Sequence, residues 1–456
     1  MKFEIVVAHD SKRGIGLNNA IPWENPEDMT FFRTLTKGDS ISKPIVIMGS
    51  RTFCSLKETP LRDRLNIVIS SGMEQRDDCM VVRSVKECIT RVMKMSSVET
   101  AFVIGGSSIY NQFLDSGVVT KIHSNLINGD YGCDRFFDEI PSRFTHDFSH
   151  AGKTVVFNTY SYTNTEEVSY LNLVKNIIKN GEHRDDRTGT GTFSLFGTSL
   201  RFSLKDYRVP VLTTKKVFWS GVVKELLWFI SGSTDGSVLS KQGVRIWDKN
   251  GSREFLDNLG FKDREVGDLG PIYPFSWRHY GAKYIDCKTD YSGKGVDQLQ
   301  RCINMIKTDP WSRRIIMTSW NPVDLDIMNL PPCHMTLQLY VSRSMSGEKE
   351  LSGQVYQRSV DTALGLPFNI SSYSLLIHMI AQCCDMKAKE LVHVMGDTHM
   401  YSDHVSPISE QINRVPFEFP SVHMNSSIRN IDDFSLEDIV LDGYYCHPSV
   451  KMDMSA

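Results

Sequence analysis

The chain has 456 residues, long enough for roughly two or three domains of ordinary size. Hydrophobic residues make up 41% of it and charged residues 23%, values that exclude disorder as the main state. Because 51 Lys and Arg residues nearly balance 54 Asp and Glu residues, broad attraction to nucleic acid or to anionic lipid is not expected.

Short β-branched runs alternate with amphipathic stretches over the first 162 residues. Buried parallel strands joined by helices have this pattern, so we expect an α/β domain with a mostly parallel sheet at 1–162. The predicted strands are 5–8, 44–49, 66–70, 80–83, 101–106, 121–126 and 154–162.

The pattern changes after Glu167 to longer helices, such as 220–230, and to alternating strands, such as 335–341. A second helix is predicted at 372–384 and a second strand at 353–357. These features predict an α+β domain over 168–456. Residues 163–167 are polar and contain no Gly or Pro, which indicates a short junction between domains that abut.

Cysteine usage indicates the compartment. The ten cysteines form no CxxC pair, and the chain has no apolar run long enough to span a membrane. No signal-peptide pattern precedes the first strand. We therefore expect a cytoplasmic protein with reduced thiols and no membrane contact. The spacing of His and Cys residues fits no metal site, so no metal is expected.

Two turns of the first domain have the form of phosphate-binding loops. One contains Gly105-Gly106 between a predicted strand and a helix start, and the other contains Gly49-Ser50-Arg51. Free backbone N–H groups at a helix start attract phosphate, and Arg51 offers a guanidinium for an additional one. A packing turn explains either turn alone about equally well, but the two together favour a dinucleotide.

Asp28 lies in a predicted first helical turn, where a solvated carboxylate is the ordinary interpretation. Its neighbourhood changes that interpretation. With the segment GIGLNNAIPW at 14–23 before it and LRDR at 61–64 after it, the stretch 1–162 resembles dihydrofolate reductase.

The resemblance implies that Asp28 binds the pterin ring and promotes its protonation beside a water held by Trp23. It implies that Arg64 pairs with the glutamate carboxylate of folate. Ser124 is placed where the family usually has a Thr bonded to the carboxylate, and a cis peptide bond is expected at Gly105-Gly106. The other folate-pocket residues implied are Ala8, Met29 and Phe32. Those implied for NADPH are Ala8, Ile15, Gly16, Gly49, Ser50, Arg51, Thr52, Ser70, Ile104, Gly105, Gly106, Ser107 and Tyr110. Ser50 stands where a basic residue is common, which leaves the 2′-phosphate of NADPH to Arg51.

Cys333 follows Pro331-Pro332 at the start of a predicted strand. A lone cysteine is usually a packing residue, and the adjacent His334 makes no dyad because neighbours on a strand face opposite sides. Three arginine motifs change the interpretation: DRTGTGT at 186–192, Arg313-Arg314, and QRSVD at 357–361. With ELLWF at 225–229, GDLGPIY at 267–273, GLPFN at 365–369 and GDTHMY at 396–401, the chain from Glu167 onward resembles thymidylate synthase.

That chemistry requires a nucleophile. The uracil carbon to be methylated carries no acidic proton, so a thiolate must first add to the neighbouring ring carbon. The resemblance implies that Cys333 is this thiolate, favoured by Arg358, and that Glu225 is a general acid and base acting through water.

The resemblance also implies the binding residues. Asn369 reads the uracil edge, while His399 and Tyr401 hold the ribose hydroxyl. The dUMP phosphate is assigned to Arg187, Arg358 and Ser359, joined by Arg313 and Arg314 from the partner subunit of a homodimer. Asp361 is assigned to the same pocket. Residues implied around 5,10-methylenetetrahydrofolate are Trp247, Leu330, Leu364, Gly365 and Phe368. Pro274 replaces a usual Gly, which predicts a rearranged loop if that Gly has a positive φ.

The two resemblances together imply a bifunctional enzyme. One half methylates dUMP to dTMP with 5,10-methylenetetrahydrofolate and releases dihydrofolate, which the other half reduces with NADPH. Two alternatives stay open. In the first, one half is catalytically inactive and serves as a scaffold, as Pro274 and Ser50 suggest. In the second, the arginines bind RNA, but the near-neutral net charge of the chain argues against this.

Overall fold

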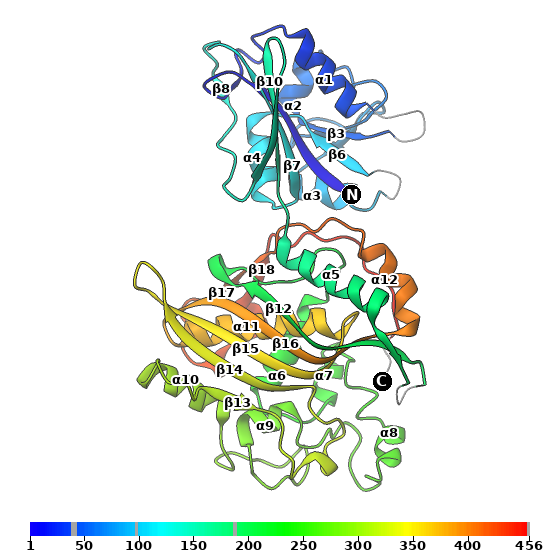
Figure 1. Cartoon of the computed structure of the whole chain (residues 1–456), viewed down its shortest axis with the longest axis vertical. Helices are drawn as coiled ribbons and strands as arrows, with labels where there is room; N and C mark the ends of the chain where they lie inside the picture. The colour runs from blue at the N-terminus through cyan, green and yellow to red at the C-terminus, as the bar shows by residue number, and fades with distance from the viewer. Residues whose placement is uncertain (38–42, 96–98, 186–188, 454–456) are drawn as a thin grey trace.

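A computed structural model describes residues 1–37, 43–95, 99–185 and 189–453. Figure 1 shows two domains stacked along the long axis, with the chain passing once from β10 (Val155–Ser161) to α5 (Thr165–Asn180). Among the described residues, none of the helices combines the length and the apolarity needed to cross a membrane.

The N-terminal domain is built on an eight-stranded sheet with the order β5-β4-β3-β6-β1-β7-β10-β9. The neighbouring pairs from β5 to β7 are parallel, and β10 is antiparallel to both β7 and β9. The strands are β1 (Lys2–His9), β3 (Ile45–Gly49), β4 (Leu65–Ile69), β5 (Met80–Val82), β6 (Thr100–Val103), β7 (Val119–Ile127), β9 (Thr145–Ala151) and β10. A small ribbon pairs β2 (Gly14–Gly16) with β8 (Arg135–Phe136).

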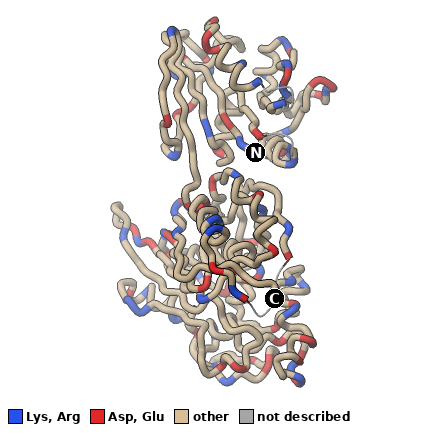
Figure 2. Tube along the Cα trace, turned by 45° about the vertical axis from the view of Figure 1, so that its right-hand side comes forward, with Lys and Arg blue, Asp and Glu red and all other residues tan. Residues whose placement is uncertain are grey.

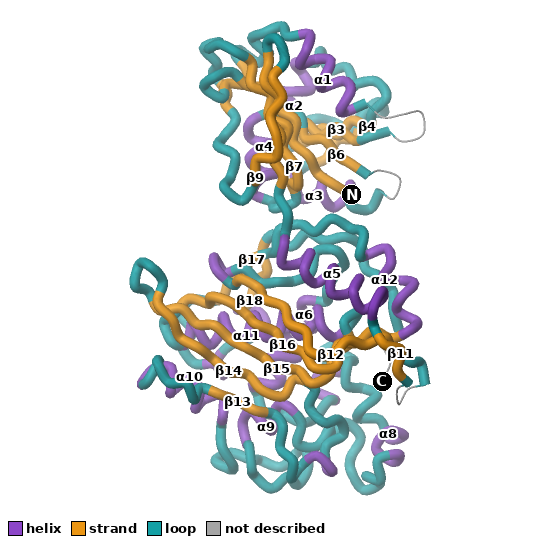
Figure 3. Tube along the Cα trace, in the orientation of Figure 1, coloured by secondary structure: helices purple, strands orange, loops and turns teal. Residues whose placement is uncertain are grey.

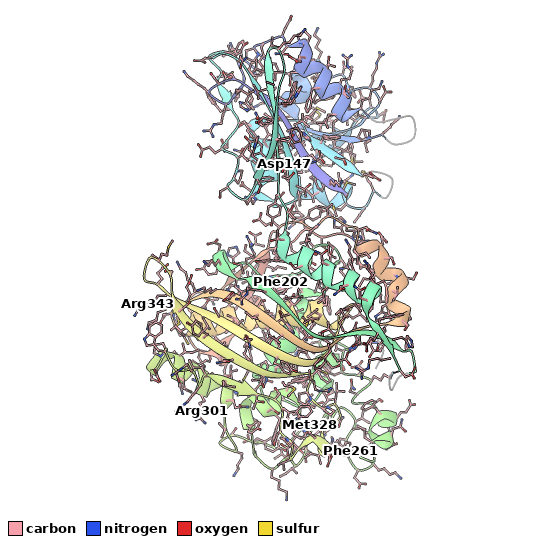
Figure 4. All side chains as sticks on the ribbon, viewed as in Figure 1. Asp147, Phe202, Phe261, Arg301, Met328 and Arg343 are labelled. Atoms are coloured by element: carbon pink, nitrogen blue, oxygen red, sulfur yellow. The ribbon has the colours of Figure 1, made fainter. Side chains whose placement is uncertain are left out.

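The predicted mostly parallel sheet is confirmed, and each predicted strand of this domain exists. β9 escaped prediction because all its residues are exposed, so it lacks the apolar alternation of a half-buried strand. Asp147, labelled in Figure 4, lies on this edge strand.

Helices cover both faces of this sheet, because alternate residues of β1 face opposite sides. Ile5 and Val7 pack with Phe113 on one face, while Val6 packs with Phe53 and Phe32 on the other. The helices are α1 (Pro26–Thr36) and α2 (Ser50–Ser55) on the second face, and α3 (Val85–Val92) and α4 (Ser107–Asp115) on the first.

The C-terminal domain is built on a six-stranded mixed sheet with the order β11-β12-β16-β15-β14-β13. β15 and β16 are parallel and the other pairs are antiparallel. The strands are β11 (Glu182–Arg184), β12 (Thr192–Ser203), β13 (Ile316–Thr318), β14 (His334–Arg343), β15 (Lys349–Asp361) and β16 (Lys387–Tyr401), with a separate pair β17 (Ser421–Met424) and β18 (Ile439–Asp442).

The helices of this domain surround a large apolar core. They are α5, α6 (Trp219–Ile230), α7 (Ser237–Lys241), α8 (Arg253–Asn258), α9 (Tyr273–His279), α10 (Gln298–Thr308), α11 (Gly365–Cys383) and α12 (Val405–Gln411). α11 packs on β15 and β16, and Phe202 of β12, labelled in Figure 4, is fully buried in the same core. The helix predicted at 372–384 begins earlier, at Gly365. In the turn just before it, the Asp361 carboxylate accepts the N–H groups of Ala363 and Leu364.

The expected junction at 163–167 is mostly helix. α5 begins at Thr165, and the Asn164 side chain caps it by accepting the Glu167 N–H at 3.1 Å. Glu167 is fully buried and accepts hydrogen bonds from the main chain and hydroxyls of Thr213 and Thr214. The polar residues that suggested a linker are therefore a helix cap and a buried carboxylate.

The two domains abut, as expected. Phe417 of the C-terminal domain is 1% exposed and packs in the apolar cluster of the N-terminal domain, with its ring centre 6.3 Å from that of Phe3. The next residue, Glu418, pairs with Arg143 across the junction at 3.2 Å. Contact between the domains is thus both apolar and ionic.

Candidate active sites

A cavity of about 540 Å3 lies at the carboxyl ends of the parallel strands of the N-terminal domain. Ala8 lies near the end of β1, Gly49 ends β3, and Gly105-Gly106 follow β6. The peptide bond between the two glycines is cis, as expected. Parallel strands thus bring separate turns of the sequence to one opening.

One side of the cavity suits a dinucleotide. The N-caps of α2 and α4 are Gly49 and Gly106, and neither helix has a side-chain cap, so their first N–H groups stay available. A Cβ at Gly49 would lie 3.1 Å from Ile109, tighter than an ordinary contact. The residues expected at NADPH that line the cavity are Ala8, Ile15, Gly16, Gly49, Ser50, Arg51, Thr52, Ile104, Gly105, Gly106, Ser107 and Tyr110. Ser70 is not among them, and its hydroxyl accepts the Met73 N–H.

Asp28 lies on the other side of the cavity, in the first turn of α1, and is 8% exposed. The Asn25 side chain fixes this turn by accepting the Asp28 N–H at 3.0 Å. Burial raises the pKa of Asp28, and a hydrogen bond from Asn125 Nδ2 to Asp28 Oδ1, 2.7 Å long, opposes that rise. A buried carboxyl with a raised pKa is suited to holding a proton beside a ligand.

The predicted position of Ser124 is wrong. Its hydroxyl pairs with His9 Nε2 at 2.8 Å, and Asn125 occupies the place beside Asp28. Because alternate residues of β7 face opposite sides of the sheet, an error of one position selects the wrong face. Ile127, which shares the face of Asn125 and packs beside Trp23, was the sequence signal that could have fixed the register.

Three other residues expected at folate, Trp23, Met29 and Phe32, line the cavity. Arg64 lies outside the lining, with its Nε donating to the Thr36 carbonyl at 3.0 Å and its guanidinium 5.8 Å from the Phe32 ring centre. Lining residues to which the sequence analysis gave no role in the site are Val6, Asn19, Ala20, Ile21, Ser55, Leu56, Leu61, Ile69, Ser108, Ile109, Asn125 and Arg135.

The second site lies at one end of the strands that form the sheet of the C-terminal domain. β15 and β16 run parallel, so their carboxyl ends meet, and the register places Ser359 beside Asp397 and Asp361 beside His399. β14 runs antiparallel to β15 and begins at this end, directly after Cys333. Topology therefore gathers residues that are far apart in the sequence.

Cys333 lies against a fixed guanidinium. Arg358 Nη2 is 3.9 Å from Cys333 Sγ, and the same side chain donates to the carbonyls of Pro331 and Pro332 at 2.8 and 2.9 Å. The guanidinium is thus fixed in contact with the sulfur by two other hydrogen bonds. The Cys333 N–H donates to the hydroxyl of Tyr273, a buried residue that sequence reasoning quoted in a motif but gave no role.

His334 is not the base of Cys333. Its ring stacks on Tyr273, with centres 3.9 Å apart, and its Nδ1 lies 2.6 Å from the Tyr373 hydroxyl. Burial lowers the pKa of His334 to about 3, so the ring is neutral. The predicted absence of a Cys–His dyad agrees with this arrangement.

Glu225 is the strongest acid–base candidate of this domain. It is buried in α6, and Trp247 Nε1 donates to its Oε1 at 2.8 Å. Burial raises the pKa of Glu225 to about 7, while the Trp247 hydrogen bond opposes the rise. A carboxyl that titrates near neutral pH can both accept and donate a proton during turnover.

Replacing Trp247 with Phe should remove the hydrogen bond that stabilises the ionised Glu225 carboxylate. The midpoint of the acidic limb in the pH profile expected for dUMP methylation should then move to higher pH by about one unit, because a hydrogen bond to a charged group contributes about 1.5 kcal/mol. The measurement is kcat for dTMP formation against pH at saturating substrates, because Trp247 is also expected at the folate. Trp228, whose indole N–H is buried without a partner in the described residues, provides the control Trp228→Phe. A limb that stays in place in Trp247→Phe contradicts the role of Glu225.

Several residues expected at the nucleotide are held in place by contacts with neighbouring side chains. Asn369 Oδ1 accepts from Gln357 Nε2 at 3.1 Å, and Gln357 Oε1 lies 2.8 Å from His393 Nε2. The sequence analysis quoted Gln357 in a motif but gave it no role, and it fixes the orientation of the Asn369 amide. His399 Nδ1 lies 3.2 Å from Asp397 Oδ1, and this contact lowers the pKa of Asp397 to about 2. The Tyr401 ring packs edge-on against His399.

The remaining expected residues of this site differ in position. Arg187 lies outside the described residues. Arg313 and Arg314 are exposed directly before β13, at the edge of the sheet. Residues expected around the second folate are the buried Trp247 and the half-buried Leu330, Leu364, Gly365 and Phe368, the last two in the first turns of α11.

Pro274 requires no rearranged loop. It lies in the first turn of α9, where the missing N–H has no helical partner and the fixed φ suits the helix. Pro274 therefore lies in an ordinary first helical turn of this chain.

Comparison with known proteins matches both domains. The family model described as dihydrofolate reductase matches residues 2–168, and the model described as thymidylate synthase matches 168–456. A protein of Zea mays named bifunctional dihydrofolate reductase-thymidylate synthase is 43% identical over 99% of this chain and 96% of its own length. A protein of the same name from Paramecium tetraurelia is 41% identical over 99% of this chain and 98% of its own length. A protein of that name with the number 2, from Arabidopsis thaliana, is 42% identical over 99% of this chain and 88% of its own length.

Proposed function

This chain belongs to the family of bifunctional dihydrofolate reductase-thymidylate synthases, and we propose which of its residues perform the two reactions. It is an oxidoreductase and a methyltransferase that uses NADPH and 5,10-methylenetetrahydrofolate. The observation that carries the proposal is the Cys333–Arg358 pair at the strand ends of the second sheet.

In the synthase site, Cys333 Sγ forms a bond to the ring carbon next to the one that is methylated. The electron pair of the ring double bond moves toward the carbonyl, which makes the methylated carbon nucleophilic. Glu225 moves protons through water, Asn369 orients the uracil, and His399 and Tyr401 hold the ribose. 5,10-Methylenetetrahydrofolate supplies the carbon and the reducing electrons. The sulfur leaves when the product forms, so the thiolate is regenerated.

The phosphate of dUMP is assigned to Arg187, Arg358 and Ser359. Arg358 is already held by two proline carbonyls, so it loses little freedom when the nucleotide binds. Asp361 orders the start of α11, on which Asn369 stands.

In the reductase site, NADPH supplies a hydride. Its phosphates are assigned to the free N–H groups that begin α2 and α4 and to Arg51. Asp28 holds the pterin and favours its protonation, because burial raises the pKa of Asp28 and so favours the form that carries a proton. Arg64 is proposed at the glutamate carboxylate of folate.

A homodimer is proposed through the outer face of the six-stranded sheet. Tyr340 and Tyr356 of this face are 61% and 40% exposed, and Ile316 of the edge strand is 45% exposed. α11 packs against the other face, which leaves this one without a layer (Figure 3). Exposed aromatic residues in one place are typical of a protein interface. Arg313 and Arg314 at its edge are proposed to enter the synthase site of the partner.

Two inactive variants should restore each other if Arg313 and Arg314 act across the dimer. We expect Cys333→Ala and the double variant Arg313→Ala/Arg314→Ala to be nearly inactive in dTMP formation alone. After unfolding and refolding as an equal mixture, about a quarter of the parent activity should return, because half the dimers then carry one complete site. Mixing without refolding is the control. No recovery in a refolded mixture that is dimeric would exclude the contribution of these arginines in trans.

A cytoplasmic location is proposed as well. All ten cysteines lie in the described residues and are free thiols, as in a reducing compartment. Figure 2 shows Lys and Arg residues interspersed with Asp and Glu residues along the trace of both domains.

A further inference from the structure

Asn125 contacts Asp28 with only one end of its amide. Nδ2 donates to Asp28 Oδ1 at 2.7 Å. The other end, Oδ1, is buried and has no hydrogen-bond partner among the described residues. Buried side-chain oxygens are nearly always paired, so an orphan beside an active-site carboxyl requires an explanation.

The neighbours of Asn125 explain why Oδ1 is orphaned. In the register of the sheet, Asn125 lies between Ala8 of β1 and Phe157 of β10. Side chains in direct register share one face of the sheet, so a methyl group and a phenyl ring flank the amide. Phe31 of α1 packs on Phe157 with ring centres 4.7 Å apart and extends the apolar surroundings. No donor therefore locks the amide in one orientation.

The side-chain amide of Asn carries an NH2 donor and a carbonyl oxygen acceptor of nearly the same size. A half-turn about the last side-chain torsion exchanges their positions. In either orientation, the atom turned away from Asp28 meets the same apolar neighbours. The two orientations thus differ mainly in the atom they present to Asp28. An ionised carboxylate requires the NH2 group, whereas a protonated carboxyl can donate its O–H to the amide oxygen.

We propose that the Asn125 amide rotates by a half-turn when Asp28 gains or loses its proton. Asn125 is then a positioning residue that forms a hydrogen bond with both the protonated and the ionised form of the carboxyl. This inference rests on the proposed role of Asp28 in the reductase site. When Asp28 takes up a proton, Asn125 Oδ1 accepts the new O–H; when the proton passes to the substrate, Nδ2 again donates to the carboxylate. No bond other than these hydrogen bonds changes.

Among the described residues, the other titratable groups near Asp28 form no hydrogen bond with it. His123 Nε2 pairs with Glu4 at 2.9 Å on the same face of the sheet, and the Tyr110 hydroxyl donates to the Val6 carbonyl. Glu27, the neighbour on α1, accepts from the main chain of Lys153 and Thr154. His150 stacks on Phe157 from β9, while Arg51 and Arg135 line the cavity. Among the described residues, Asn125 is the only side chain that forms a hydrogen bond with Asp28.

The test is an infrared titration of the full chain in which asparagine carries a 13C label in its side-chain carbonyl. The protonated-carboxyl band that disappears in Asp28→Asn reports Asp28, and the carbonyl band that disappears in Asn125→Leu reports Asn125. We expect both bands to change with pH at one midpoint. An Asn125 band that stays constant while the Asp28 band titrates would overturn the proposal.

Two variants provide a second readout, the pH profile of hydride transfer in single turnovers. Asn125→Leu has nearly the same shape but neither donor nor acceptor. It should raise the midpoint by up to about one pH unit, because the hydrogen bond lost from the charged carboxylate is stronger than the one lost from the neutral carboxyl. Asn125→Thr keeps a hydroxyl that donates or accepts and should keep the parent midpoint. An equal midpoint in all three proteins, with parent-like thermal unfolding, would also refute the inference. Reductase activity that stays at the parent rate in Asp28→Ala would instead refute the proposed function, independently of the infrared result.

Discussion

Cys333→Ala abolishes dTMP formation, lowering kcat by roughly four orders of magnitude or more, while NADPH-dependent dihydrofolate reduction continues at the parent rate. Without the sulfur, the uracil ring cannot be activated for attack on the one-carbon unit. Arg358 keeps its bonds to Pro331 and Pro332, so the variant should fold normally. The two activities are measured separately, by dTMP formation from dUMP and by oxidation of NADPH with dihydrofolate.

Cys287→Ala is the matched control for the first variant. Cys287 is partly exposed, like Cys333, but lies outside the motifs assigned to either site. Both activities should survive its replacement. Loss of dihydrofolate reduction in Cys333→Ala would show that the assignment of one site to each domain is wrong.

Asp28→Ala has the opposite effect, lowering dihydrofolate reduction by about 10²–10⁴-fold and leaving dTMP formation intact. The variant removes the buried carboxyl that favours protonation of the pterin, and Asn125 then has no carboxylate to bind. The rate of NADPH oxidation should also lose its dependence on the Asp28 proton, so the pH profile of the residual activity should be flatter than that of the parent.

Glu27→Ala controls for the removal of a carboxylate from the same helical turn. Glu27 bonds to Lys153 and Thr154 outside the cavity. Its replacement should leave reduction near the parent rate. If Asp28→Ala were no slower than Glu27→Ala, Asp28 would have no part in the chemistry.

Together, the two variants address the alternative that one half is an inactive scaffold. If one half were inactive, the parent protein would have only one of the two activities, and only one of the two variants could lose an activity. Pro274 no longer supports it, because a proline suits the first turn of α9. Ser50 lines the cavity at the start of α2, which leaves Arg51 as the basic residue of that turn.

Local pattern predicted much of the fold. The buried strands of the N-terminal domain have β-branched runs, and α6 has an apolar run long enough for a helix. β9 lacked that pattern because nothing covers it. α11 was predicted too short because its first turn contains Gly365 and Pro367, residues that usually mark a turn.

Tertiary register limited the prediction of the sites. Motifs identified Cys333, Arg358 and Asp28, but the choice between Ser124 and Asn125 depended on which face of β7 meets α1. Gln357 belongs to a quoted motif, yet its contact with Asn369 joins a strand to a helix that only the folded chain brings together.

The placement of the two domains could not be predicted from local pattern. Phe417 occurs between Pro416 and Glu418 in a segment without periodicity, and its burial comes from Phe3 at the other end of the chain. Such contacts carry no sequence signal, since the partner residues lie in another domain.

Covalent capture tests the nucleophile most directly. The parent protein is incubated with 5-fluoro-dUMP and 5,10-methylenetetrahydrofolate, digested, and examined by mass spectrometry. Fluorine cannot leave as a proton does, so the sulfur–nucleotide bond should persist together with the folate. The expected result is a ternary adduct on the peptide that contains Cys333. A folded, active protein that yields no adduct, or carries it on a different cysteine, would contradict the assignment.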